Sequence, residues 1–351
     1  MAEAAGISVS SRGRFARVVF AAALLGCASG AKVSAADFYQ GRTITMVVGS
    51  DVGGGFDAFA RLLSRHLGRA IPGNPRIVVE NMPGAGSAAA ASYIYSIAPK
   101  DGTMIGALVP GGLLAPLFEG RPAAYDTTKF RFLGSANASA RLCISEKTSG
   151  IATFEEATKR KVLVGAGSVG SASYDYAYLH KNLHHGNFDI VAGYKGMADI
   201  LLAMERGEVQ AVCGFDWSSL KTQRSNLGPD GQFNFLLKVE VQPDAQLDAL
   251  GIPAARTFAA NERDAAVGDL VASQQIFGRP YAVAPGVPAD RLRILKAAFD
   301  ASIRSEQLAS EAAAAGLQID SASGNLVEEA VRAMYQAPAD IVAGARTAIR
   351  P

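Results

Sequence analysis

The chain has 351 residues, which at about 150 residues per domain suggests two domains. Charged residues make up 19% and hydrophobic residues 49% of the chain, and 34 Lys and Arg stand against 32 Asp and Glu. This composition excludes a disordered chain, a strongly basic nucleic-acid-binding protein and a small disulfide-rich domain. The unusual residue is glycine, with 37 of 351 residues against about 7% in an average protein.

The first 36 residues contain the three parts of a secretory signal peptide, in the expected order. Arg12, Arg14 and Arg17 form a basic segment, an apolar run covers residues 18–25, and the small residues 34–36 offer a cleavage site. The apolar run is too short to span a bilayer, which takes about 20 helical residues. We therefore expect this segment to be removed and the mature protein to lie in the periplasm.

The signal peptide carries the slight excess of positive charge. Its removal takes away four basic residues and one acidic residue, so the mature chain has 30 basic and 31 acidic residues and a net charge of −1. Cys27 in the same segment raises the alternative of a lipidated cysteine. Because Leu25 and Gly26 make a poor lipoprotein signal and a later cleavage site exists, we expect Cys27 to be discarded.

Two cysteines, Cys143 and Cys213, remain in the mature chain. In an oxidising compartment an even pair favours a disulfide, and with two cysteines only one pairing exists. Two buried free thiols are the alternative.

The first half of the mature chain alternates apolar strands, glycine-rich loops and amphipathic helices. The expected strands are residues 43–48, 76–80 and 103–108, and the loops that follow them are 49–55, 81–86 and 110–112. A helix from Phe56 to about Arg69 has apolar residues on one face, and an alanine-rich helix ends at Ile97. This alternation predicts an α/β fold with crossover helices.

The same pattern begins again after Ser149. The expected strands are residues 161–164, 188–192 and 209–212, the loops are 165–171, 193–196 and 213–217, and the segment after Pro288 is largely helical. We therefore predict two α/β lobes, each with a mainly parallel sheet.

The glycine loops lie where an α/β sheet binds ligands, at the carboxyl ends of its strands. A loop that leads into a helix presents free backbone N–H groups and the positive end of the helix dipole, which together bind anions. Two such sets of loops, facing one another, would close on a small anion. The alternative is that the loops are ordinary tight turns.

One loop matches the dinucleotide-binding pattern through Gly165, Gly167 and Gly170. The acid that this pattern requires at the end of the next strand is missing, because Asp189 falls at the start of that strand. We therefore expect no nicotinamide cofactor, and no cofactor of any other kind.

His180 and His184 have the spacing of two metal ligands on one helix face, and His185 is adjacent. No third ligand is evident, so we expect exposed histidines on a solvated helix and no metal site. Nucleophile motifs of hydrolases are also absent from the sequence, and we expect the protein not to be an enzyme.

Taken in order, several short motifs resemble the extracytoplasmic solute-binding proteins of tripartite tricarboxylate transporters, the Bug family. These motifs are residues 44–48 with 53–57, residues 78–86, residues 98–103, residues 193–196 with 206–209, and residues 284–289. Each motif is weak alone, but together they cover essentially the whole mature chain.

The resemblance implies a two-lobed periplasmic binding protein of type II, the Venus-flytrap fold, with the ligand in the cleft between the lobes. Residues 37–139 and 276–351 would form lobe 1, and residues 140–275 lobe 2. The family binds a carboxylate mainly through backbone N–H groups, hydroxyls and water. The ligand-binding residues so implied are Ser50, Asp51, Val52, Gly53, Gly54, Gly55, Phe56, Asp57, Asn81, Gly84, Ala85 and Gly86 in lobe 1, and Gly165, Ala166, Gly167, Ser168, Ser171, Gly193, Tyr194 and Asp216 in lobe 2.

One residue departs from the family pattern. Asp51 stands where the family usually has an apolar residue or proline, and Asp51 and Asp57 together would repel a polyanion. The loops contain no arginine to balance a trianion. We therefore expect a mono- or dicarboxylate, with or without an amine or amide group.

The sequence thus predicts a periplasmic binding protein that delivers a carboxylate to the membrane subunits of a transporter. It would have no nucleic-acid partner and no membrane span of its own after removal of the signal peptide. A ligand-sensing subunit that serves a receptor is an alternative with the same cleft. A secreted α/β enzyme is a second alternative.

Overall fold

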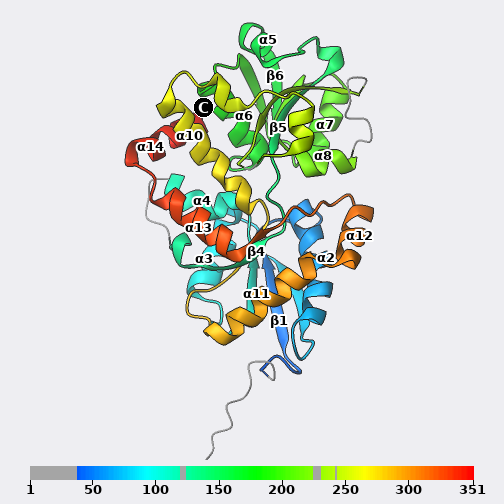
Figure 1. Ribbon diagram of the computed structural model, residues 1–351, viewed down its shortest axis with the longest axis vertical. Coiled ribbons are helices and arrows are strands. Elements are labelled where there is room, and N and C mark those ends of the chain that lie inside the picture. Colours follow the sequence, from blue (N-terminus) through cyan, green and yellow to red (C-terminus); the bar gives the residue numbers. More distant parts are fainter. Residues whose placement is uncertain (1–37, 119–123, 224–230, 242) are drawn as a thin grey trace, which may run out of the picture. The chain divides into compact units, whose positions relative to one another are not determined.

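The computed structural model describes residues 38–118, 124–223, 231–241 and 243–351 (Figure 1). The expected signal peptide, residues 1–36, and Cys27 lie outside these described residues. Among the described helices, none is long and apolar enough to cross a membrane.

A six-stranded sheet is built from both ends of the described chain. In spatial order its strands are β11 (Ala322–Ser323), β4 (Arg131–Ser135), β10 (Pro280–Val283), β3 (Met104–Ala107), β1 (Thr43–Val48) and β2 (Arg76–Asn81). The helices of these parts of the chain are α2 (Gly55–Ala70), α3 (Ala88–Ser96), α4 (Pro110–Phe118), α11 (Ala289–Ile303), α12 (Glu306–Ala314), α13 (Gly324–Tyr335) and α14 (Ala339–Ala348).

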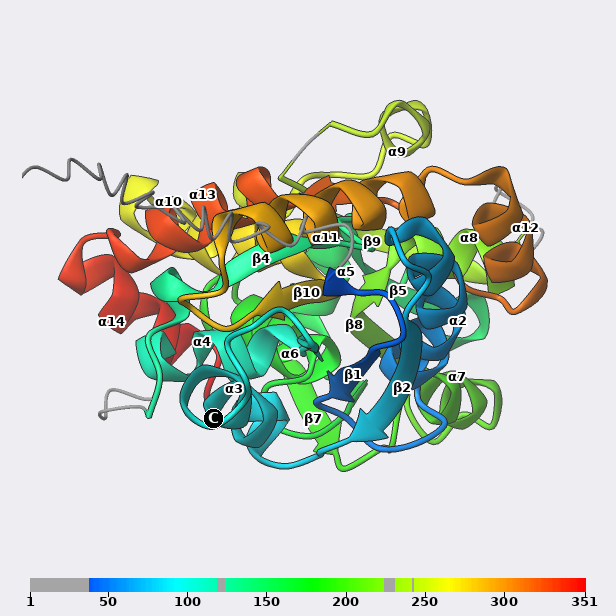
Figure 2. The same ribbon diagram turned by 90° about the horizontal axis from the view of Figure 1, so that it is seen from below.

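Helix α2 shows how the sequence pattern positions an element on this sheet. Its apolar residues recur every three or four positions, so that Phe59, Leu63 and Leu67 share one face and are fully buried. Asp57 in the first turn and Arg69 in the last complement the helix dipole. The buried face packs on β2 and on α11, and Figure 2 shows α2 beside β2, the edge strand.

A five-stranded sheet is formed by the middle of the chain. In spatial order its strands are β7 (Phe188–Ala192), β6 (Val162–Ala166), β8 (Ala211–Asp216), β5 (Arg141–Glu146) and β9 (Phe233–Val239). Its helices are α5 (Phe154–Lys159), α6 (Ala172–Asn182), α7 (Met197–Glu205), α8 (Trp217–Gln223), α9 (Ala245–Ala249) and α10 (Glu262–Ala272). Short 3-10 turns cover Ala85–Ser87, Thr127–Lys129, Lys147–Ser149, Ala255–Phe258 and Ser273–Phe277.

The structure confirms the α/β fold, and each of its two sheets is mixed, with parallel pairing among the earlier strands. Parallel pairing is found between β1 and β2, β1 and β3, β6 and β7, and β6 and β8. The other pairs are antiparallel: β10 with β3 and β4, β11 with β4, and β5 with β8 and β9. The repeated strand–loop–helix pattern in the sequence indicates only strands joined by crossover helices. It therefore did not predict the antiparallel strands, which come from distant parts of the chain.

The chain passes between the two sheets at two places that lie side by side. It leaves the six-stranded sheet after Ser135, enters β5 at Arg141, and returns through Arg279 into β10. The N–H of Ala136 donates to the carbonyl of Arg279 at 2.9 Å, which ties the two passages together. Helix α14 packs against α10 and α6 as well as α4. The lobe boundaries expected after residues 139 and 275 stay a prediction.

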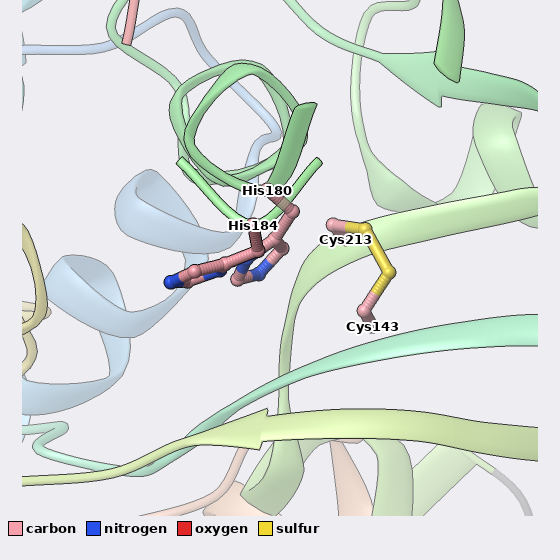
Figure 3. The surroundings of a disulfide bond; sticks show 4 residues. All are labelled: Cys143, His180, His184 and Cys213. Carbon is pink, nitrogen blue, oxygen red and sulfur yellow. A yellow bond between two sulfur atoms is a disulfide. The ribbon is translucent and has the colours of Figure 1, made fainter. Parts of the chain in front are cut away.

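Cys143 on β5 and Cys213 on β8 form a disulfide, which closes a separation of 70 residues. Both residues are fully buried in an apolar cluster that includes Leu236 and Leu237 of β9. Figure 3 shows the disulfide joining the neighbouring strands beside the helix that carries His180.

Removal of this disulfide by Cys143→Ala with Cys213→Ala should lower the free energy of unfolding by about 2–4 kcal/mol, because the unfolded chain regains the entropy of a long loop. Urea unfolding of the variant and of the wild type measures the loss. Reductant should lower the stability of the wild type toward that of the variant and leave the variant unchanged. Identical unfolding curves for the oxidised and reduced wild type would contradict this expectation.

Candidate ligand-binding site

Loops that follow strands of both sheets line one cavity of about 210 Å³. Its lining residues are Ala85, Gly86, Gly111, Leu114, Ala115, Phe118, Val169, Gly170, Asp175, Ile349 and Arg350. The loops approach closely here, since a Cβ atom added to Gly111 would lie 2.9 Å from the carbonyl oxygen of Gly170. Glycine at position 111 therefore permits backbone from the two sheets to meet at the cavity.

The loop between β1 and α2 is held in place by the carboxylate of Asp57. This carboxylate accepts hydrogen bonds from the N–H of Gly53 at 2.8 Å, from the amide of Asn81 at 2.9 Å and from Arg61 at 2.9 and 3.0 Å. The same Asn81 amide donates to the carbonyl of Ser50 at 3.0 Å. Burial alone would raise the pKa of Asp57, but the bonds from Arg61, Gly53 and Asn81 outweigh it and hold the pKa below 3.8.

Asp57 and Asn81 thus support the loop, and their polar atoms are already engaged. The positive charge of Arg61 also balances the negative charge of Asp57. Of the two carboxylates that the sequence suggested would repel an anionic ligand, only Asp51 therefore remains unbalanced. Asp51 is exposed, as are the following residues up to Gly55.

The N-terminus of α2 is open above this loop. Gly54 precedes the helix in an extended conformation, and no side chain caps the first turn. A Cβ atom at Gly53 would meet no described atom within 4 Å, and one at Gly54 would meet only the carbonyl of Asp51 at 3.7 Å. The first N–H groups of this 16-residue helix therefore have no side-chain cap, which suits an anion. In the same loop, the buried hydroxyl of Ser50 has no hydrogen-bond partner among the described residues.

Four consecutive residues after β2 have a positive φ. The angles are 136° at Gly84, 46° at Ala85, 60° at Gly86 and 85° at Ser87, and a non-glycine residue in this region costs about 1–3 kcal/mol. The hydroxyl of Ser87 accepts the N–H of Val109 at 3.1 Å, which docks this strained turn on the chain after β3. The turn is thereby fixed with Ala85 and Gly86 against the cavity.

More polar groups are hydrogen-bonded in the loop after β6 than in the loop after β1. Ser171 caps α6 by accepting the N–H of Tyr174 at 3.3 Å, and the hydroxyl of Ser173 accepts the N–H of Gly167 at 3.0 Å. Ser168, Val169 and Gly170 lie between these fixed points.

Two further predicted residues brace the same loop through their backbone. The N–H of Gly193 donates to the carbonyl of Gly167 at 3.3 Å, and that of Tyr194 donates to the carbonyl of Ala166 at 3.2 Å. Ala166 and Gly165 are buried in β6, where Gly165 leaves room for Ile200, which would lie 2.6 Å from an added Cβ. The N–H groups of Gly193 and Tyr194 are therefore used to position the loop after β6, and they are not free to bind a ligand.

Asp175 and Arg350 supply the charged groups of the cavity lining. Burial raises the pKa of Asp175 to about 7, although the N–H of Gly170 and the charge of Arg350 both lower it. Arg350 is placed by its carbonyl, which accepts from the amide of Asn182 at 2.6 Å. The cavity therefore holds a carboxyl group that gains or loses its proton near neutral pH.

Asp216 is not among the residues that line the cavity. Its carboxylate accepts hydrogen bonds from Arg141 at 2.6 Å, from the hydroxyl of Ser218 at 2.5 Å and from the N–H of Ser219 at 2.8 Å. Burial would raise its pKa, but Arg141 and Arg279 lower it, so Asp216 stays ionised. It is a buried structural anion near the two passages of the chain.

Of the predicted site residues, only Ala85 and Gly86 line the cavity. The lining residues that were not among the predicted ligand-binding residues are Gly111, Leu114, Ala115, Phe118, Val169, Gly170, Asp175, Ile349 and Arg350, of which Gly111, Val169 and Gly170 lie in predicted glycine loops. Val169 and Gly170 lie inside a loop that was recognised, and Asp175 is an acid in the first turn of a helix, so both had a local signal. Ile349 and Arg350 had none, because only tertiary packing brings the chain end to this loop.

His180 and His184 are buried, so the expectation of exposed histidines is wrong. Their Nδ1 atoms are 2.9 Å apart, and Figure 3 shows the two imidazoles against one another. Burial lowers the pKa of His180 well below 6.5 and that of His184 to about 4, so the pair is neutral. Helix α10 covers this face, where a Cβ at Gly268 would lie 3.9 Å from His184. No group of three potential metal ligands occurs among the described residues.

No protein-family model matches this sequence, and no curated protein matches it in sequence. The fold, in contrast, is found in solved structures that match most of the chain.

Three of these structures show the likeness. MatC from Rhodopseudomonas palustris, solved with bound malate, is 19% identical, with a TM-score of 0.62 over 88% of this chain and 99% of MatC. A TctC solute-binding protein from Polaromonas, without ligand, is 17% identical, with a TM-score of 0.63 over 89% and 99% of the two chains. A second R. palustris protein, solved with adipate, is 21% identical, with a TM-score of 0.60 over 87% and 97%. The chain therefore has the fold of these proteins.

Replacement of Asp57 by Asn should destabilise the protein by about 1–3 kcal/mol, because the ion pair with Arg61 and the bond from Gly53 are lost or weakened. The folded pKa of Asp57 is depressed, so its contribution is present above the unfolded pKa near 4 and disappears as the pH falls through the folded value. Urea unfolding at pH 7 and pH 3 should therefore show a difference between wild type and variant that shrinks at the lower pH. A difference that stays constant over this range would contradict the assignment.

Proposed function

We propose that this protein is a periplasmic solute-binding protein of the Bug type, which captures a small carboxylate for a tripartite tricarboxylate transporter. The proposal is carried by the N-terminus of α2, which no side chain caps. The loops of both sheets that converge on one cavity give it further support. The fold shared with MatC and the Polaromonas TctC protein supports it, as does the expected signal peptide.

The ligand class follows from the donors that the site offers. Backbone N–H groups and a helix N-terminus stabilise a carboxylate without needing a net positive charge on the protein. We infer a mono- or dicarboxylate, with or without an amine or amide, and favour a dicarboxylate. The malate and adipate in the two R. palustris structures support this choice.

The transporter is the proposed partner because the resemblance is to transporter-associated proteins. A sensing subunit that serves a receptor would bind its ligand in the same cleft and would differ only in the surface that binds its partner. A secreted enzyme would instead need an activated nucleophile, and the cavity lining offers Asp175 as its one titrating carboxyl group.

A thermal-shift screen of carboxylates, with NAD included, tests the proposed ligand class. A carboxylate present at 100 times its dissociation constant should stabilise the protein by about 2.7 kcal/mol, because it binds only the folded state. We expect malate or another dicarboxylate to raise the melting temperature and NAD to have no effect. Stabilisation by NAD and by no carboxylate would overturn the proposal.

The affinity for malate should fall as the pH rises from 6.5 to 8.5. Below pH 7 the Asp175 carboxyl is neutral, and above pH 7 it becomes an anion that repels a bound carboxylate. Isothermal titration calorimetry at several pH values should show weaker binding by several-fold at the upper end. The Asp175→Asn variant, which cannot ionise, should bind malate equally at both ends, and an unchanged pH dependence in that variant would rule out this role.

A further inference from the structure

Arg279 is a half-buried cation fixed where the chain returns to the six-stranded sheet. Its N–H donates to the hydroxyl of Ser135 at 3.1 Å, and its carbonyl accepts the N–H of Ala136 at 2.9 Å. Because both bonds come from the other passage of the chain, the backbone of Arg279 has a defined position between the two sheets.

The guanidinium of Arg279 extends toward the start of α2. It lies 5.6 Å from the centre of the Phe59 ring, and its Nη2 atom is 3.8 Å from the place a Cβ would take on Gly55. Its one hydrogen bond to a described side-chain or backbone acceptor is a long one, from Nη1 to the carbonyl of Gln318 at 3.4 Å. The side chain therefore approaches the helix N-terminus with most of its N–H donors not hydrogen-bonded to described residues.

The surrounding charges leave this guanidinium without a direct ionic partner. No carboxylate of the described residues lies within 4.0 Å of it, whereas Asp216, the acid in its vicinity, is paired with Arg141 at 2.6 Å. Burial lowers the pKa of Arg279, and the charge of Asp216 raises it. The guanidinium groups of Arg141 and Arg279 thus both act on the carboxylate of Asp216, and only that of Arg141 forms an ion pair with it.

We propose that Arg279 is a specificity-determining residue that binds a carboxylate of the ligand between its guanidinium and the N-terminus of α2. The guanidinium donates charge-assisted hydrogen bonds, and the first N–H groups of α2 donate from the other side. The open space above Gly53 and Gly54 admits the ligand. This inference rests on the proposed function and adds to it an arginine that lies outside the glycine loops.

Calorimetric titration with succinate and with its monoamide, succinamate, tests the inference. Arg279→Gln should weaken succinate binding at least tenfold and should reduce the preference of the wild type for succinate over succinamate. Arg65→Gln removes the same charge from an exposed ion pair with Glu311 and should bind as the wild type does. Wild-type affinity in Arg279→Gln would overturn the inference while the proposed function stands. Failure of the wild type to bind any carboxylate would instead overturn the proposed function, and this inference with it.

A second variant keeps the test valid if Arg279→Gln does not fold. Gly55→Ala places a methyl group 3.8 Å from Nη2, an ordinary van der Waals distance, in a helix position that alanine accepts. It should fold and weaken succinate binding, because the methyl group stands between the guanidinium and the helix start. Gly268→Ala, on α10, has similar room at 3.5 Å from Leu183 and should leave binding unchanged. Equal succinate affinity in the two alanine variants would contradict the inference.

Discussion

The conformation of the loop between β1 and α2 depends on the hydrogen bonds that the Asp57 carboxylate accepts. They join the loop after β1, the end of β2 and the second turn of α2 through Gly53, Asn81 and Arg61. Because the carboxylate is fully used in this way, it does not cap α2 through the N–H groups that a ligand would need. The result is a rigid loop with an open helix N-terminus, which is the preorganised form of an anion site.

Electrostatic balance in this region depends on individual pairs rather than on net charge. Arg61 balances Asp57, and Arg141 balances Asp216. Arg279 is left with no ion pair among the described residues, and Asp175 is left with a pKa near 7. A chain with nearly balanced charges can therefore attract a carboxylate at one place, since a partly buried charge acts more strongly than one in water.

The sequence predicted the parts of the fold that local patterns determine. The strand at residues 43–48 was confirmed at both ends, and β8 was displaced, predicted at 209–212 and observed at Ala211–Asp216. Several glycine loops were also placed after the right strands, but the expected loop at residues 110–112 begins α4 and residues 213–216 belong to β8. Strands β4, β5, β9, β10 and β11 were missed, because antiparallel partners from distant segments leave no local strand–loop–helix signal.

Side-chain roles were harder to predict than elements. Asp57 was correctly expected in the first turn of a helix. Its three partners are Gly53, Arg61 and Asn81. Helical geometry brings Arg61 to the carboxylate and tertiary packing brings Asn81, so neither contact was predicted from the loop motif. The burial of His180 and His184 depends on α10, far along the chain. Arg279 and Arg350 reach their sites from outside every loop motif, so no pattern in the loops could indicate them.

The central claim is that backbone N–H groups at the start of α2 bind the carboxylate. Nuclear magnetic resonance of 15N-labelled protein during a malate titration measures these groups directly. The account predicts that the amide protons of Gly55 and Phe56 shift downfield and saturate together, at the dissociation constant that calorimetry gives. Calorimetric binding of malate with no change in these amide resonances would contradict the account.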